Sequence, residues 1–81
     1  MRVRVLLFAG LRERAGRAEI VRDVPEGTTV AGLWNLLARD LPAIAPYGRV
    51  VSVAVNADYA KMNAPVSDGD EVAFLPPVSG G

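Results

Sequence analysis

A single stretch of this 81-residue chain has the residue spacing of an amphipathic helix, and it limits the folds available. Thr28 or Thr29 offers a hydroxyl to cap that helix, and Pro42 disfavours helical geometry at Leu41, so the helix is expected to end near Asp40. Because the apolar runs elsewhere alternate as strands do, the sequence predicts one helix lying across a sheet. The apolar helix positions, all expected in the core, are Val30, Leu33, Trp34, Leu37 and Leu41.

Two strands are expected before the helix. Residues 2–9 alternate between apolar and other positions, which is the pattern of a strand. Residues 11–15 can form one helical turn, and Gly16 supplies a reversal into a second strand over 17–24. The apolar residues of this second strand do not keep strict alternation, and a bulge would explain the irregularity.

Further strands are expected after the helix, separated by segments rich in proline, glycine and aspartate. With the first two strands they give an α+β fold with a mixed sheet of four to five strands. This order of elements is the β-grasp, or ubiquitin-like, arrangement, expected over residues 1–75. The segments expected after the helix are a loop at 42–49, a strand at 50–55, a turn at 56–58, a short edge strand at 59–61, a turn at 67–70 and a strand at 71–75.

The first and last strands are expected to lie side by side and parallel in the middle of that sheet. Their inward residues would face the helix, and the residues between them would form an apolar patch on the open face, where polar residues are usual. Such a patch favours docking of a partner protein; a covering by residues 42–49 or a weak homodimer would also account for it. The inward set is Val3, Val5, Leu7, Val72 and Phe74, and the patch is Leu6, Phe8, Ala73 and Leu75.

The last six residues, 76–81, are expected to form a flexible extended tail. Pro76 and Pro77 cannot donate ladder hydrogen bonds, so they end the strand, and the small residues that follow have few restrictions. At ~3.3 Å per residue the tail reaches roughly 20 Å. The carboxylate of Gly81 would be ionised at neutral pH and could attack the α-phosphate of ATP. The alternative is an ordinary frayed terminus.

Composition excludes several classes of function. With no cysteine and no histidine, the chain has no thiolate nucleophile, imidazole base or Cys/His zinc site, so no metal site is expected. Nine basic and nine acidic residues give a net charge of zero, which argues against binding nucleic acid or an anionic membrane surface. No apolar stretch approaches the ~20 residues of a membrane span, and a cytoplasmic location is expected by default.

Two segments resemble the small, sulfur-carrying subunit of molybdopterin synthase. They are the ending Asp68-Gly69-Asp70-Glu71-Val72-Ala73-Phe74-Leu75-Pro76-Pro77-Val78-Ser79-Gly80-Gly81 and the opening Leu7-Phe8-Ala9-Gly10-Leu11-Arg12-Glu13. The resemblance implies that a ubiquitin-activating-like adenylyltransferase uses ATP to adenylate Gly81, which then becomes a thiocarboxylate. It further implies sulfur transfer to a cyclic pterin precursor within the large synthase subunit, in a heterotetramer.

The resemblance also implies how labour is divided. This chain would be a carrier without catalytic side chains of its own and without a permanently bound cofactor, while its partners supply the ATP site and the acid–base groups. Val78, Ser79 and Gly80 would lie in the partner's channel. Arg12 and Arg39 could pair with acidic residues of the partner.

Other functions share the same tail. A β-grasp sulfur carrier for thiamine synthesis or for tRNA thiolation would also need two terminal glycines. The tail therefore does not distinguish these carriers from the small subunit of molybdopterin synthase. A ubiquitin-like protein modifier, joined through Gly81 to lysines, or a binding module that is never activated, is an alternative of a different class.

Overall fold

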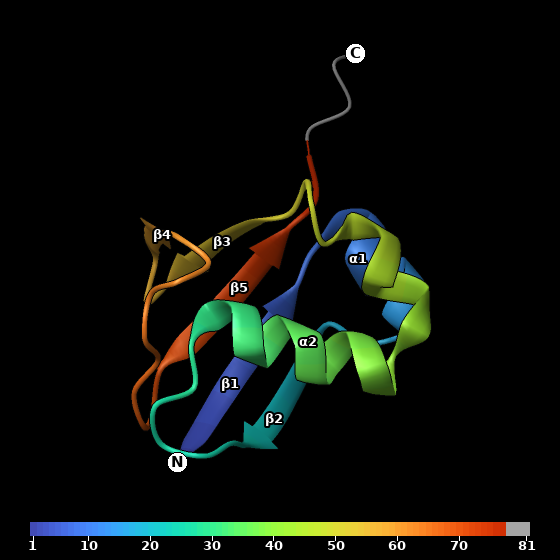
Figure 1. The fold of residues 1–81 in the computed structure, drawn as a ribbon. Coiled ribbons are helices and arrows are strands. Elements are labelled where there is room, and N and C mark those ends of the chain that lie inside the picture. Colours follow the sequence, from blue (N-terminus) through green and yellow to red (C-terminus); the bar gives the residue numbers. More distant parts are fainter. Residues whose placement is uncertain (78–81) are drawn as a thin grey trace.

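The computed structural model describes residues 1–77, which form a five-stranded mixed sheet with one long helix across one face (Figure 1). The strand order is β2-β1-β5-β3-β4, with β1 and β5 parallel at the centre. This is the predicted ubiquitin-like β-grasp architecture. The elements are β1 (Arg2–Leu7), α1 (Ala9–Ala15), β2 (Glu19–Asp23), α2 (Val30–Asp40), the 3₁₀ helix η1 (Pro42–Tyr47), β3 (Ser52–Val55), β4 (Asp58–Ala60) and β5 (Glu71–Leu75).

The core lies between α2 and the two central strands. The predicted inward residues of β1 and β5 are all buried, and their register pairs Val5 with Val72 and Leu7 with Phe74. Trp34 of α2 packs on Phe74 with ring centroids 5.0 Å apart and tilted planes, an arrangement that aromatic pairs prefer. The prediction that Trp34 belongs to the core is therefore confirmed.

Both ends of α2 follow the sequence signals. The Thr29 hydroxyl accepts a hydrogen bond from the Gly32 amide at 3.1 Å, which satisfies one of the free donors of the first turn. The helix ends at Asp40, and Leu41 caps it with its own amide bonded to the Leu37 carbonyl. The stop before Pro42 is where the sequence predicted it.

The region after β1 differs from the prediction. The strand ends at Leu7 rather than at residue 9, because the Phe8 carbonyl accepts the amides of Leu11 and Arg12 and so starts α1. The helix is correspondingly longer than the single turn expected over 11–15. It ends at Ala15 and is capped by Gly16, whose φ of 73° is left-handed and would strain most other residues.

The bulge offered as an explanation of the irregular second strand is absent from residues 19–23. Strand β2 pairs with β1 in unbroken register, with Ile20 opposite Val5 and Arg22 opposite Val3. Alternation is kept because Arg22 takes an inward position, where its guanidinium binds Asp40 of α2 at 2.8 Å. At this inward position of β2, an ion pair with α2 takes the place of an apolar contact.

Residues 42–49 are not the loop that was expected. Pro42–Tyr47 form η1, which packs against α1 and α2 and buries Ile44 completely. The expected strand at 50–55 starts only at Ser52, since the amides of Val50 and Val51 both bond to the Tyr47 carbonyl in a turn.

The turn between β3 and β4 is tied to the start of β5. Asn56 and Ala57 both have positive φ, 50° and 73°, as a tight two-residue hairpin requires. The Asn56 side chain donates to Asp70 at 2.9 Å and accepts the Glu71 amide at 3.0 Å. Asp70 also accepts the Ser67 amide, so this acidic turn organises the entry to the central strand.

Phe74→Ala should lower the free energy of unfolding by about 3–5 kcal/mol, because it removes a ring from the closed centre of the core. Val21→Ala is the matched control: Val21 is 54% exposed on β2, and its truncation should change stability by less than about 0.5 kcal/mol. Urea unfolding followed by far-UV circular dichroism measures both. A loss below about 1 kcal/mol for Phe74→Ala would contradict the described packing.

Asp23→Asn should remove a small part of the acid sensitivity of the fold. The hydrogen bond from Arg2, and then its positive charge, lower the pKa of Asp23 from its ordinary 3.8. A lowered folded-state pKa stabilises the fold above pH 3.8, and this contribution is lost as the pH falls through the lower value. The variant should therefore be slightly less stable than the parent near neutral pH, with the gap in urea midpoints narrowing at about pH 3. A gap that widens there would contradict the pairing.

Candidate functional site

The predicted apolar patch lies where the chain leaves the sheet. Leu6 of β1 pairs in register with Ala73 of β5, and both point away from the core because their neighbours in each strand are buried. Phe8 is 42% exposed, and Leu6, Ala73 and Leu75 are half-buried. We call these four residues the tail-root patch.

The first part of β1 carries paired charges on this open face. Arg2 binds Asp23 at 3.1 Å, while Arg4 contacts Glu71 and lies 3.6 Å from Glu19. The hydrogen bond and charge of Glu71 raise the pKa of Arg4, so this guanidinium stays protonated. The open face is thus polarised along β1, with a neutralised ionic half at its start and an apolar half at the root of the tail.

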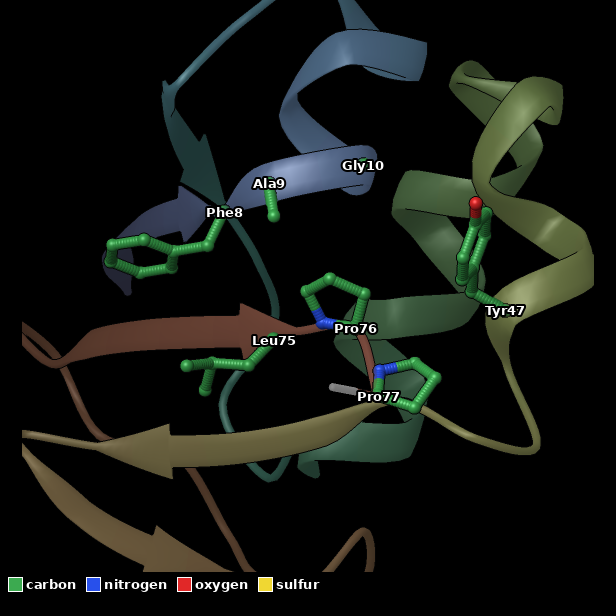
Figure 2. Close-up of a pocket in the computed structure, with 7 residues that line it drawn as sticks. All are labelled: Phe8, Ala9, Gly10, Tyr47, Leu75, Pro76 and Pro77. Carbon is green, nitrogen blue, oxygen red and sulfur yellow. The ribbon is translucent and has the colours of Figure 1, made fainter. Parts of the chain in front are cut away.

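A hollow adjoins the patch, with a volume of about 520 Å³ (Figure 2). Its walls come from three separate segments: the β1–α1 junction, the end of η1 and the chain that leaves β5. Figure 2 shows Phe8 and Leu75 on one side of Pro76 and Tyr47 on the other. The residues that line it are Phe8, Ala9, Gly10, Tyr47, Leu75, Pro76 and Pro77.

The alternative explanation of the patch, a cover by residues 42–49, is not what the structure shows. Segment 42–49 was one candidate, but η1 packs against α1 and α2, and among the described residues of that segment Tyr47 alone reaches the hollow. Sequence reasoning missed Tyr47 because its segment was read as a loop. The apolar Ile44 between Pro42 and Tyr47 is the signal that could have indicated a packed element.

The two predicted arginines lie in different places. Arg12 is exposed on α1, the helix whose first residues border the hollow. Arg39 is in the last turn of α2, which covers the opposite face of the sheet, and lies 3.7 Å from Asp40. Arg12 thus shares a helix with Ala9 and Gly10 of the hollow but is not among the lining residues, and the structure does not bring Arg39 to the tail-root patch.

The chemistry of the described residues is limited. Residues 1–77 contain no cluster of acidic side chains that could hold a metal ion, and no buried polar or charged residue. None of their helices is long and apolar enough to cross a membrane. The predicted reacting residue and channel residues, Gly81, Gly80, Ser79 and Val78, lie outside the described part of the chain. What the structure offers is an apolar surface beside the exit of the tail.

Comparison with known proteins decides the family. The model of the ThiS family matches residues 5–81. The chain belongs to the ThiS family. It is 40% identical to the molybdopterin synthase sulfur carrier subunit of Escherichia coli, over 98% of this chain and 99% of that protein. It is also 37% identical to the subunit of the same name from Mycobacterium tuberculosis, over 100% and 99% of the two chains. The resemblance found in the sequence is confirmed.

Solved structures of related proteins have the same fold. SAMP1 from Haloferax volcanii matches with a TM-score of 0.87 and 32% identity, covering 100% of both chains. A protein–protein complex of subunits 1 and 2 of the molybdopterin-converting factor from Helicobacter pylori contains a chain that matches with a TM-score of 0.71. That chain is 23% identical and covers 100% of both, so it supports the fold alone. This ThiS-family chain therefore shares its architecture with SAMP1 and with a chain of that complex.

Proposed function

We propose that this chain is the sulfur carrier subunit of a molybdopterin synthase, with Gly81 as the residue that carries sulfur. The observation that carries the proposal is the position of the tail-root patch. The sheet of this ThiS-family chain ends at Leu75, and the apolar half of its open face lies beside that point. A partner that binds this surface would therefore be close to the point where the tail begins.

The proposed chemistry has two activation steps. A carboxylate oxygen of Gly81 attacks the α-phosphorus of ATP, pyrophosphate leaves, and an acyl-adenylate forms. A sulfide-level sulfur nucleophile then attacks the carbonyl carbon, AMP leaves, and a thiocarboxylate forms. Its sulfur attacks a carbon of the cyclic pterin precursor and displaces an oxygen substituent, and water then cleaves the acyl–sulfur bond, which leaves sulfur on the pterin and returns Gly81 to a carboxylate. ATP is consumed by the activating partner, and this chain holds no permanent cofactor.

Two partners are proposed. One is the large synthase subunit, which would bind the tail-root patch and admit Val78, Ser79 and Gly80 to its channel in a heterotetramer. The other is a ubiquitin-activating-like adenylyltransferase that acts in the cytoplasm, where ATP is available. Arg12 is proposed to pair with acidic partner residues beside the hollow, and Arg39 is proposed only as a peripheral contact because α2 lies across the other face.

Phe8→Glu should abolish complex formation with the large subunit and leave the domain folded, since the ring is 42% exposed and contributes little to the core. A carboxylate buried in an apolar interface would be desolvated without a partner. Val21→Glu is the matched control, because Val21 is exposed on the same open face of the sheet but on β2, outside the tail-root patch. Titration calorimetry and circular dichroism measure binding and folding. Equal affinity of parent and Phe8→Glu would refute the docking surface, and a change confined to self-association would identify a homodimer contact.

Incubation with the adenylyltransferase, ATP and a sulfur source should replace one oxygen of this chain by sulfur, seen by intact mass spectrometry. A variant lacking Gly81, and one with a residue added after it, should show no exchange. Adducts on the lysines of other proteins would indicate a modifier instead. An unchanged mass in the parent would indicate a binding module that is never activated.

A further inference from the structure

The side chain of Tyr47 makes several contacts with α1. Its hydroxyl accepts a hydrogen bond from Arg14 Nε at 3.0 Å, and the Arg14 guanidinium carbon lies 5.4 Å from the ring centroid. A β-carbon placed on Gly10 would lie 3.5 Å from the same hydroxyl, so the ring rests close to the backbone of α1. The side chain is therefore held against α1 on the rim of the hollow.

The backbone of Tyr47 is hydrogen-bonded to the segment that leads into β3. Its carbonyl accepts the amides of Val50 at 3.0 Å and Val51 at 2.9 Å, immediately before β3 begins. The first residue of β3, Ser52, pairs with Leu75, the last residue of β5. Tyr47 thus connects α1 to the strand that flanks the end of β5, and its ring lines the hollow together with Pro76 and Pro77 (Figure 2).

We propose that Tyr47, held by Arg14, is a positioning residue that limits the directions in which the tail leaves the sheet. The inference rests on the proposed function, in which Gly81 must reach a reaction centre in a partner. Pro76 and Pro77 each fix their own φ, and Pro77 also restricts the ψ of Pro76, but no proline follows Pro77 to restrict its ψ. The prolines alone therefore leave the direction after Pro77 open. At ~3.3 Å per residue, a 20° swing at Pro77 moves a group four residues further on by about 5 Å. A misplacement of about 1 Å can already slow a positioned reaction by 10²-fold.

The chain allows a direct measurement of this direction. It has one tryptophan and no cysteine, so Trp34 is a unique donor and a label on Ser79→Cys is a unique acceptor for time-resolved energy transfer. The parent should give a narrow distribution of distances between them. Tyr47→Ala should broaden it, Arg14→Ala should broaden it less, and Tyr47→Phe should retain most of the narrow distribution because the ring remains. Tyr59→Ala is the control for loss of an exposed tyrosine outside the hollow.

A second measurement connects direction to rate. With sulfur loaded in advance and the large subunit saturating, Tyr47→Ala should transfer sulfur at least about tenfold more slowly than the parent, and Tyr47→Phe should recover most of the rate. A distance distribution in Tyr47→Ala that equals the parent's would overturn the inference, as would a parent distribution already as broad. If Tyr47→Ala does not fold, the exposed Arg14→Ala decides by the same criterion. Failure of the parent to load sulfur would sink the proposed function, whereas the distance measurement is independent of loading.

Discussion

The parallel pairing of β1 and β5 is the interaction on which the other features depend. It joins the two ends of the sequence, with Arg4 opposite Glu71 and Leu7 opposite Phe74, and it places both strands in the middle of the sheet. Parallel neighbours need a long connection between them, and here everything from α1 to β4 supplies it. As a result, the chain leaves β5 beside the start of α1. Residues of both segments line the hollow.

The two faces of this strand pair differ in composition. The inner face is packed without a buried polar residue within residues 1–77, so its stability comes from close packing of apolar side chains. The outer face is divided, since its charged half is neutralised by its own ion pairs and its apolar half has no such partner among the described residues. A self-paired charged surface offers little to a partner, whereas an exposed apolar surface does. The division supports the proposal that a partner docks at the root of the tail.

Sequence reasoning recovered the parts of the fold that depend on periodicity and failed where tertiary contacts replace it. The stripe of α2 and the alternation of β1 and β5 were predicted because burial on one face leaves a regular pattern. Arg22 broke that pattern in β2, and its ion pair with Asp40 could not be read from local sequence. The segment of η1 was read as a loop because Pro42 and Pro46 are turn residues, although Ile44 is completely buried. The tail-root patch was predicted from alternation alone, but the contribution of Tyr47 to the hollow was not, since it depends on that misread segment.

The packing around the exit matters because the proposed reactive group is remote from the folded body. A carrier whose tail must enter a partner's site gains from flexibility near its end, yet flexibility at the root would spread the end over many directions and reduce the effective concentration at the target. The arrangement around Pro76 separates these requirements. Residues from α1, η1 and β5 line the hollow at the exit, and within residues 76–81 the two glycines come last. A body that is stiff up to Pro77 would let a partner that binds the tail-root patch determine where the last glycine goes.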